Sequence, residues 1–332
     1  MVVFLTGGSG LLGSHVAERL RGRGVGVRAL CRAGADTRFL NGLGCEVVAG
    51  DLLDPLDHQA RRMEGCQAVV HAAGDVYGGG TLERVRGPNV DGTRRILKGA
   101  AMAGIANAVH LSTVAVYGDV DGLATEERTL TSRIPPGNVY ALTKREAEKV
   151  AEELHGKDGL GITILRPSAI FGERDRRLVP RLVRVLKMRL VVLLGSGRNR
   201  FAAVYAGNVA EAVDKALGGS GAGNAFNVSE DVSVTVRSLF EGLGKELGIQ
   251  PLFVSVPGGW VQYAANLGDR LGIGIPGVSG LSLARAARLT LGDNPYPAER
   301  ARKILGWTPP YSLDEALTRT GTWIREREKG HD

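Results

Sequence analysis

The chain has 332 residues, of which 43% are hydrophobic and 23% charged, so it can form one large domain or two smaller ones and is neither a disordered nor a fibrous type. The net charge of +7 would suit a polyanionic partner, but no basic stretch is interleaved with aromatic residues, so no nucleic-acid partner is expected. No apolar run approaches the roughly 18 residues of a membrane span, and no secretory signal is expected.

The three cysteines, Cys31, Cys45 and Cys66, form no C-x-x-C pair. We expect reduced thiols in a reducing compartment, the cytoplasm, and no metal site.

The first half of the chain alternates short apolar runs with helical patterns. Strands are predicted at Val2–Leu5, Val25–Cys31, Cys45–Ala49, Ala68–Ala72, Ala108–Ser112 and Gly161–Arg166. Helices are predicted at Leu11–Arg23, Asn89–Gly104 and Tyr140–His155. This alternation is typical of βαβ units with right-handed crossovers, so residues 1–172 are predicted to form an α/β domain around a doubly wound parallel sheet.

The alternation ends after Arg166. Helices are predicted at Glu173–Arg189, Val204–Leu217, Ser238–Leu247, Ala298–Leu305 and Leu313–Arg327, with a short strand at Ala225–Val228 and a glycine-rich apolar stretch at Pro257–Ile275. We interpret residues 173–332 as a smaller, mainly substrate-binding lobe, from which a segment near 204–230 is a candidate to rejoin the first domain.

A glycine-rich turn follows the first predicted strand. Gly7, Gly10 and Gly13 have the spacing G-x-x-G-x-x-G, and Leu11 and Leu12 begin the next helix. Glycines let the backbone approach a pyrophosphate, and the helix N-terminus supplies N–H donors, so a dinucleotide is predicted to bind here. A plain glycine turn is the simpler alternative.

The end of the second predicted strand indicates which dinucleotide is bound. An acidic residue there would favour NAD, but this chain has Arg32, which could pair with a 2′-phosphate, so NADP is predicted and NAD stays possible. A solvated surface arginine is the alternative. Asp51, before Leu52, could accept a hydrogen bond from the adenine amino group, or could be a turn or cap residue.

Two further segments carry groups that could move a proton. Tyr140 and Lys144 are one helical turn apart, and a nearby ammonium would lower the pKa of a phenol. Upstream, the segment Leu111–Gly118 ends a strand with hydroxyl side chains that could hold a substrate oxygen. Both would meet beyond the carboxyl ends of the strands, where ligands bind in doubly wound sheets.

Together these segments make the chain resemble an extended short-chain dehydrogenase/reductase, of the epimerase/dehydratase superfamily. The matching motifs are Thr6–Gly13, Gly50–Leu52, His71–Gly74, Asn89–Thr93, Ser112–Gly118, Tyr140–Lys144, Arg166–Gly172 and Ile304–Pro309. They run in the expected order along nearly the whole chain.

The resemblance implies a role for each matching residue. Tyr140 would donate or accept the proton, Lys144 would bind the nicotinamide ribose and tune Tyr140, and Thr113 would stand where the family has a serine. The cofactor would be lined by His71, Ala72, Ala73 and Gly74, and bordered by Pro167 and Ser168. Asn89 would support the fourth helix or cap it.

The resemblance also implies a homodimer formed through the helices Asn89–Gly104 and Tyr140–His155. Apolar stripes for such an interface could come from Ile96, Leu97, Ala100 and Ala101, and from Ala147, Val150 and Ala151.

Features of the second half leave the small-molecule substrate open. Phe201 and Ala202 stand where many sugar-nucleotide epimerases carry Arg-Asp, while Val204–Ala210 and Arg32 resemble the hydroxysteroid dehydrogenase and dihydroflavonol-reductase-like branch. We therefore predict an NADP-dependent oxidoreductase acting on a secondary alcohol or ketone of an apolar ring. A basic helical face over Arg174–Arg189 could instead hold a diphosphate, which would favour a nucleotide-sugar epimerase or dehydratase. A redox-silent NADP-binding regulatory protein and a nucleic-acid-binding module are alternatives of other classes.

Overall fold

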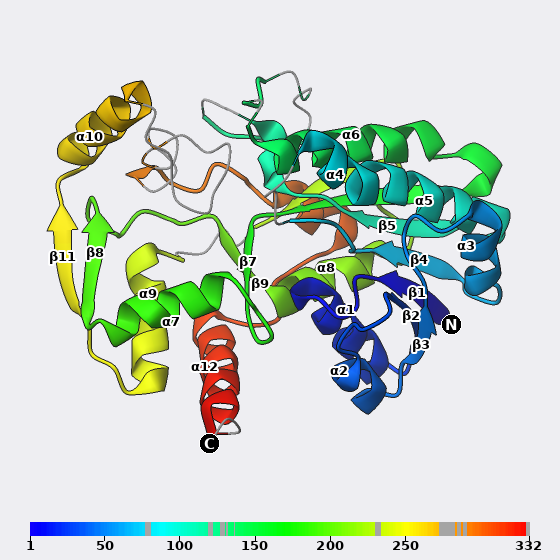
Figure 1. Cartoon of the computed structure of the whole chain (residues 1–332), viewed down its shortest axis with the longest axis horizontal. Coiled ribbons are helices and arrows are strands. Elements are labelled where there is room, and N and C mark those ends of the chain that lie inside the picture. Colours follow the sequence, from blue (N-terminus) through cyan, green and yellow to red (C-terminus); the bar gives the residue numbers. More distant parts are fainter. Residues whose placement is uncertain are drawn as a thin grey trace.

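The computed structural model describes residues 1–76, 81–118, 122–126, 130, 132–135, 137–229, 234–271, 283, 287 and 291–329. Across these residues, seven strands form one parallel sheet in the order β10-β6-β5-β4-β1-β2-β3 (Figure 1). They are β1 (Val2–Thr6), β2 (Gly26–Cys31), β3 (Glu46–Ala49), β4 (Ala68–His71), β5 (Asn107–Leu111), β6 (Gly161–Pro167) and β10 (Ala225–Val228). The prediction of a doubly wound α/β fold is confirmed.

Helices cover both faces of this sheet. Helix α1 packs against α8 on one face, and α3, α5 and α6 lie on the other. The helices of this part are α1 (Leu11–Gly22), α2 (Arg38–Gly42), α3 (Leu56–Met63), α4 (Leu82–Arg86), α5 (Gly92–Met102), α6 (Val139–Leu154) and α8 (Ala206–Ala216).

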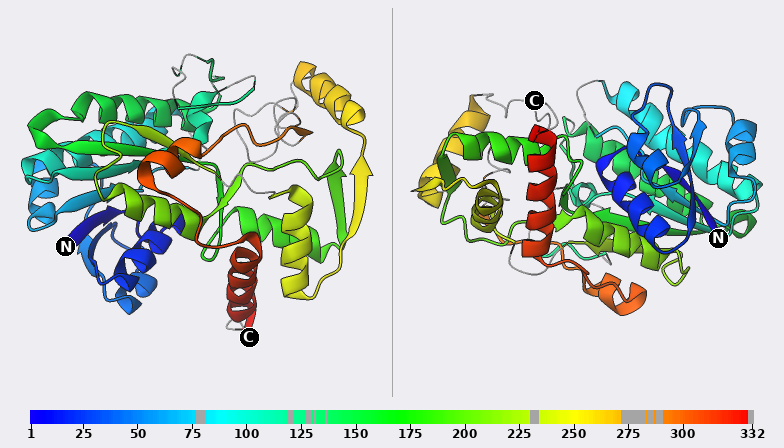
Figure 2. Two further views of the ribbon diagram at one scale, coloured as in Figure 1. Left: turned by 180° about the vertical axis from the view of Figure 1, so that it is seen from behind. Right: turned by 90° about the horizontal axis from the view of Figure 1, so that it is seen from below.

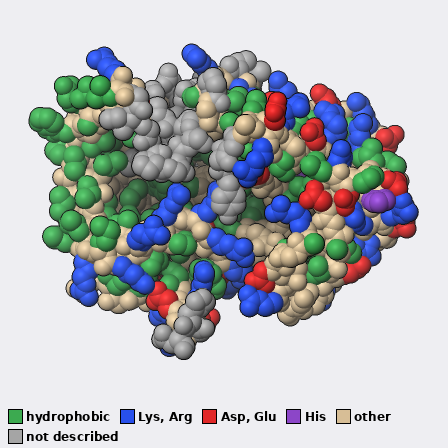
Figure 3. Space-filling view, viewed as in Figure 1, with side chains coloured by type: hydrophobic (Ala, Val, Ile, Leu, Met, Phe, Trp, Pro, Cys, Tyr) green, Lys and Arg blue, Asp and Glu red, His purple; other side chains and the backbone are tan. Residues whose placement is uncertain are grey.

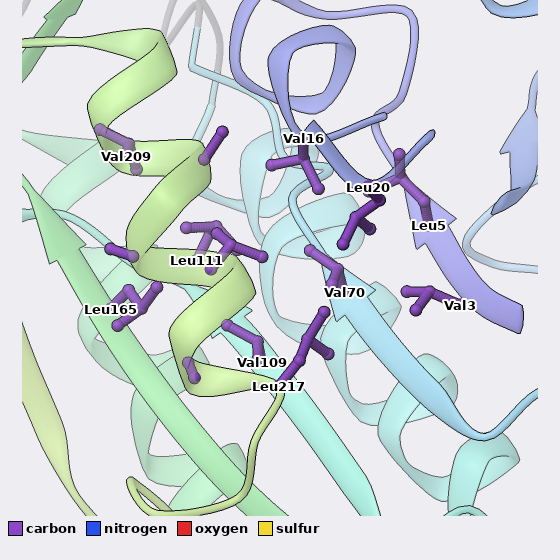
Figure 4. Packing of buried hydrophobic residues seen from close by; sticks show 14 of the residues in the cluster. Val3, Leu5, Val16, Leu20, Val70, Val109, Leu111, Leu165, Val209 and Leu217 are labelled. Atoms are coloured by element: carbon purple, nitrogen blue, oxygen red, sulfur yellow. The ribbon is translucent and has the colours of Figure 1, made fainter. Parts of the chain in front are cut away.

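Burial on both faces explains why the strands are continuous apolar runs. In β1, Val3 and Leu5 pack toward α1 and α8, whereas Phe4 packs toward α5 on the opposite face. Figure 4 shows the first of these two cores, where side chains from four strands meet Val16 and Leu20 of α1 and residues of α8.

The remaining elements surround a second core. Two short parallel sheets pair β7 (Ala169–Phe171) with β9 (Ala203–Tyr205) and β8 (Leu190–Leu194) with β11 (Leu252–Val256). The helices are α7 (Leu178–Lys187), α9 (Val236–Leu247), α10 (Gly258–Arg270) and α12 (Leu313–Lys329). We call these elements, without β7 and β9, the second lobe.

The chain crosses between the two parts several times. Helix α8 and strand β10 belong to the main sheet and its cover, so residues 206–228 return to the first part. Trp307, close to the last helix, is fully buried in the first core and donates its indole N–H to Asn208 O over 2.9 Å. Figure 2 shows this last crossing, from the orange segment beside the main sheet to the red helix α12.

The helix predicted at Glu173–Arg189 starts later than expected. Arg174 has a left-handed backbone with φ +69°, which breaks the helical path. The carboxylate of Asp175 accepts hydrogen bonds from the backbone N–H groups of Arg177, Leu178 and Val179, so α7 begins at Leu178.

The residues assigned to apolar stripes for a helix-bundle dimer were assigned wrongly, whereas the homodimer itself stays a prediction. Apart from the half-buried Ala101, all of those residues of α5 and α6 are buried within the chain itself. The outer surface of these helices carries ion pairs instead, such as Arg94 with Glu153.

Among the described residues, no helix is long and apolar enough to cross a bilayer.

Candidate active site

The glycine loop between β1 and α1 is shaped by close backbone contacts. A Cβ on Gly7, whose φ is +76°, would lie 2.7 Å from the backbone nitrogen of Ala73, and a Cβ on Gly13 would collide with the carbonyl group of Gly7. Gly10 donates its N–H to Gly7 O over 2.9 Å and directly precedes α1. The predicted loop residues all lie at this turn: Gly7, Gly10, Leu11, Leu12 and Gly13. The first N–H groups of a helix have no intrahelical partner, so the loop fits a pyrophosphate.

A chain of hydrogen bonds fixes the end of β4 beside this loop. Thr93 Oγ1 donates to Asn89 O (2.6 Å), so it accepts from His71 Nε2 (2.9 Å). His71 Nδ1 then accepts from Thr6 Oγ1 (2.7 Å), which itself accepts from Ala73 N–H (3.2 Å). Burial lowers the pKa of His71 to about 3, so the ring is neutral and ties β4 to β1 and α5. The predicted β4 residues lie at this point: His71, Ala72, Ala73 and Gly74.

Asn89 joins the loop after β4 to helix α6. Its Oδ1 accepts from Asp75 N–H (2.6 Å), and its Nδ2 donates to Asp75 O (3.1 Å) and Thr143 Oγ1 (3.0 Å). Gly74 passes close by, since a Cβ there would lie 3.0 Å from Asn89 Oδ1 and 3.7 Å from Lys144 Nζ. Asn89 stands inside a π-helical turn before α5, so it bridges two elements and does not cap a helix.

Thr113, Tyr140 and Lys144 lie together at the carboxyl end of β5. Tyr140 and Lys144 are one turn apart in α6, whose N-terminus is capped by Asn138. Thr113, in extended backbone after β5, hydrogen-bonds the Tyr140 side chain, and Lys144 Nζ donates to Leu111 O over 2.5 Å. The structure thus brings together the three residues that the sequence motifs assign to catalysis.

The electrostatics of these three residues differ from the expectation. Burial raises the pKa of Tyr140 to about 12, opposed by the hydrogen bond with Thr113 and the positive charge of Arg177. Burial lowers the pKa of Lys144 to about 8, opposed by the carboxylate of Glu148. Lys144 was expected to lower the pKa of Tyr140, but here Thr113 and Arg177 have that effect, and the ammonium is held by a backbone carbonyl.

Arg177 reaches the site from the start of the second lobe. Its Nη1 donates to Val76 O over 3.1 Å, in the loop that follows β4, and its charge acts on Tyr140. The signal in the sequence was its place in the predicted basic face, although that pattern assigned it no role at the phenol.

The predicted basic face does not continue over Arg174–Arg189. Arg174 Nε donates to Ser14 Oγ over 2.9 Å on α1, because its left-handed backbone turns it away from α7. At the other end, Lys187 pairs with Glu328 of α12 over 2.7 Å. Arg181 and Arg184, between them, are exposed.

Arg32 and Asp51 lie at the end predicted for adenosine. Arg32 follows β2 on the exposed rim, and within the described part of the chain its guanidinium makes no hydrogen bond or ion pair. Asp51 Oδ1 accepts the N–H of Leu53 over 2.9 Å, so Asp51 is a turn residue, and its contact with adenine stays a prediction. Leu52 is half-buried beside Gly92 of α5.

Pro167 and Ser168 lie at the other end of the predicted cofactor site. Pro167 ends β6, and Ser168 donates its N–H to Val228 O over 3.1 Å. The buried hydroxyls of Ser168 and Ser112 have no hydrogen-bond partner among the described residues. A polar ligand at this edge of the sheet would satisfy such groups, as a nicotinamide nucleotide could.

Sequence reasoning missed two buried features beneath the site. Arg166 forms a two-point ion pair with Glu148 of α6, Nη2 to Oε2 over 2.7 Å and Nε to Oε1 over 3.0 Å. His110 stacks on His71 with ring centroids 5.5 Å apart, and neither of its ring nitrogens has a partner in the described residues. Arg166 stood within a quoted motif, but neither Glu148 nor His110 carried a sequence signal.

Comparison with known proteins identifies the family. Residues 3–229 match the family described as "NAD dependent epimerase/dehydratase family". The chain belongs to this family, as the resemblance to extended short-chain dehydrogenases predicted, and is an NAD(P)-dependent enzyme of the oxidoreductase or epimerase type.

Individual relatives are similar over most of their length. The chain is 28% identical to 4-hydroxy-2-methyl-3-oxo-4-farnesyl-3,4-dihydroquinoline-1-oxide ketoreductase of Stigmatella aurantiaca, covering 96% of this chain and 95% of the relative. It is also 28% identical to 3 beta-hydroxysteroid dehydrogenase/Delta 5-->4-isomerase of Mycobacterium tuberculosis, covering 95% and 88%. The crystal structure of UDP-glucose 4-epimerase from Thermotoga maritima shares the fold, with TM-score 0.77, 23% identity and coverage of 99% and 100%.

Proposed function

We propose that the protein is an NADP-dependent oxidoreductase that interconverts a secondary alcohol and a ketone on an apolar ring substrate. The observation that carries the proposal is the grouping of Thr113, Tyr140 and Lys144 beyond β5, next to the glycine loop. The relatives named as a ketoreductase and as a hydroxysteroid dehydrogenase support this substrate class.

Thr113 and Tyr140 act on the substrate oxygen. Thr113 holds this oxygen, and Tyr140 moves the proton. A phenol whose pKa is about 12 is protonated at neutral pH, so it can donate to the oxygen of a ketone as it is reduced. A nicotinamide dinucleotide, when bound, exchanges a hydride with the substrate carbon. In alcohol oxidation the phenol must first lose its proton, which the Thr113 hydrogen bond and the Arg177 charge favour.

The two parts of the chain divide the binding. Residues 1–172, together with a segment near 204–230, bind the dinucleotide through the glycine loop, the end of β4 and Lys144. The remaining residues of 173–332 bind the substrate. Among them, Arg177 places its guanidinium at the loop that follows β4.

Arg32 favours NADP over NAD. Its free guanidinium can pair with a 2′-phosphate, and loss of a hydrogen bond to a charged group costs about 1.5–3 kcal/mol, or roughly 10- to 100-fold in affinity. Arg32→Asp should weaken NADPH binding by this factor, measured by NADPH fluorescence, and improve NADH relative to it. Arg198→Asp, at an exposed site of the second lobe, is the matched control. Tighter binding of NAD than NADP by the unmodified protein would refute the assignment.

A nucleotide-sugar epimerase or dehydratase is the second candidate. Arg177 favours it, because a cation near the phenol could hold a phosphate or carboxylate. Against it, Phe201 and Ala202 replace the expected Arg-Asp pair, and the nearby Arg200 pairs with Asp293 over 3.5 Å. A redox-silent regulatory protein is disfavoured by the intact Tyr140 and Lys144.

Tyr140→Phe tests the proposed chemistry. Because a positioned proton donor contributes roughly 100- to 10,000-fold, turnover should fall by that order while NADPH binding is kept. The assay follows NADPH absorbance with steroid-like and flavonoid-like ketones and, in parallel, UDP-sugars. Oxidoreduction consumes NADPH in step with product, whereas an epimerase converts its sugar with no net change in NADPH. Unchanged turnover of a ketone by Tyr140→Phe would exclude this mechanism.

A further inference from the structure

One face of the short sheet β8–β11 is apolar and uncovered. The outward residues stand directly opposite one another, Leu190 by Leu252, Val192 by Val254 and Leu194 by Val256. The inward residues Val191 and Leu193 already fill the core of the second lobe. A strand with one solvated face normally alternates apolar and polar residues, but here both faces of β8 are apolar, and so is the outward face of β11.

Helix α10 extends this apolar surface. Trp260, Tyr263 and Leu267 are spaced to share one helix face, and they are 71%, 65% and 44% exposed; Leu271, just after the helix, is 67% exposed. Hydrophobic side chains gather over β8, β11 and α10 at one end of the molecule in Figure 3. We call these exposed residues the apolar face: Leu190, Val192, Leu252, Val254, Trp260, Tyr263, Leu267 and Leu271.

Basic residues outnumber acidic ones at the end of the second lobe that carries the apolar face, although Lys187, Arg200 and Arg237 pair with Glu328, Asp293 and Glu241. Residues 178–200 and 234–271, which build this end of the second lobe, contain nine Lys or Arg and three Asp or Glu, in a chain of net charge +7. Arg189 directly precedes β8, and Arg270 is the last residue of α10; both are exposed.

This charge decides between two occupants of the apolar face. A second copy of the chain would bring two basic ends together, and like charges repel. An anionic phospholipid surface instead attracts Lys and Arg, while exposed Trp, Tyr and Leu side chains insert at the boundary between headgroups and acyl chains.

We propose that the apolar face docks the protein on the surface of an anionic phospholipid bilayer. The contact is peripheral, with Trp260 and Tyr263 in the interface and Arg189 and Arg270 near the lipid phosphates. This proposal does not depend on the proposed reaction.

Vesicle sedimentation of the full chain tests the proposal. The probes are vesicles of phosphatidylcholine alone and of phosphatidylcholine mixed with phosphatidylglycerol. Binding should require the anionic lipid and fall as salt is raised. The double variant Trp260→Ser, Tyr263→Ser should reduce partitioning at least ten-fold, and Arg189→Gln, Arg270→Gln should remove most of the salt dependence.

A matched control separates the apolar face from exposed apolar residues in general. Met102→Ser, on α5 of the first part and 61% exposed, should bind vesicles like the unmodified protein. All these positions are exposed, so thermal unfolding should show that each variant keeps its fold.

Three results would overturn the proposal. They are no binding to the mixed vesicles, equal binding by the Trp260→Ser, Tyr263→Ser variant, or a dimer in analytical ultracentrifugation that this variant converts to monomer while vesicle binding is absent. The last result would assign the apolar face to a second copy of the chain.

Discussion

At the residue scale, the site is governed by the burial of two titratable groups, the phenol of Tyr140 and the amine of Lys144. The pKa of Tyr140 is raised to about 12 and that of Lys144 lowered to about 8, in each case mainly by burial. Both shifts favour the neutral forms, so the pair is not a stable phenolate–ammonium pair before ligands bind. Thr113 and Arg177 act in the opposite direction on Tyr140, which makes them the residues through which the phenol can be tuned.

Lys144→Met should stabilise the fold in a pH-dependent way. The unfolded chain keeps the lysine proton up to about pH 10.5, whereas the folded chain releases it near pH 8. The folded state of the unmodified protein therefore gains stability as pH rises between these values, by at most about 3 kcal/mol, and is penalised in full below pH 8. The variant has no such group, so its advantage should be largest at pH 7 and should shrink by pH 10.

Urea unfolding of both proteins at pH 7 and pH 10 measures this effect. The quantity compared is the difference in unfolding free energy between the variant and the unmodified protein, taken at each pH. The loss of the hydrogen bond to Leu111 O does not depend on pH, so it cancels when the two values are compared. The same difference at both pH values would show that the lysine is not penalised by burial.

At the element scale, the junction of the glycine loop and α1 is determined by backbone contacts. Gly13 lies inside α1, where alanine is ordinarily better than glycine by about 1 kcal/mol. A Cβ at Gly13 would nevertheless meet the backbone of Gly7 and Gly8, which cannot yield as a flexible side chain would. Gly13→Ala should therefore lower the unfolding free energy by about 1–3 kcal/mol and weaken dinucleotide binding at least ten-fold.

Gly22→Ala is the control in the same helix. A Cβ there meets nothing within 4 Å, so this variant should gain about 0.5–1 kcal/mol and bind the dinucleotide unchanged. Denaturant unfolding and NADPH titration give both quantities. If the two variants behaved alike, the close approach at Gly13 would not determine the shape of the loop.

The sequence predicted those elements whose pattern or motif is local. Strand β1 and helix α12 were predicted within two residues, and Thr113, Tyr140 and Lys144 were predicted to meet because parallel strands share their carboxyl ends. Strands β8 and β11 were missed, since a five-residue apolar run does not distinguish a strand from a buried helix segment.

Other parts of the site depend on contacts that leave no local pattern. Arg177 meets the carbonyl of Val76, 101 positions earlier in the chain, and Asn89 joins Asp75 to Thr143 through one amide. Neither contact follows from periodicity. The effect of Arg177 on the pKa of Tyr140 could not be predicted from the sequence for the same reason, whereas the motif did predict that Tyr140 lies in a helix one turn before Lys144.

At the scale of the whole molecule, three buried imidazoles couple the fold to pH. Burial lowers the pKa of His15 to about 4 and of His71 to about 3, and lowers that of His110 well below its ordinary value. They lie on α1, β4 and β5, so the buried imidazoles belong both to the sheet and to a helix that covers it. Their neutral forms fit the folded chain, while the unfolded chain binds a proton at each near pH 6.5.

Stability should therefore decline steeply as the medium becomes acidic. Between pH 6.5 and the lower folded pKa values the unfolded chain holds more protons, so each buried imidazole removes about 1.4 kcal/mol per pH unit from the unfolding free energy. For His71, whose pKa in the folded chain is about 3, this amounts to about 2 kcal/mol between pH 7 and pH 5.

His110→Leu tests one ring cleanly, because the His110 nitrogens have no hydrogen-bond partner among the described residues and none is lost in the variant. Burial lowers the pKa of His110, so urea unfolding should show a smaller fall in unfolding free energy from pH 7 to pH 5 in His110→Leu than in the unmodified protein. At pH 7, where the ring is neutral in both the folded and most of the unfolded chain, the two proteins should differ by the change in packing alone. A fall of equal size in both proteins would mean that His110 takes up its proton without unfolding, and that its burial does not contribute to acid sensitivity.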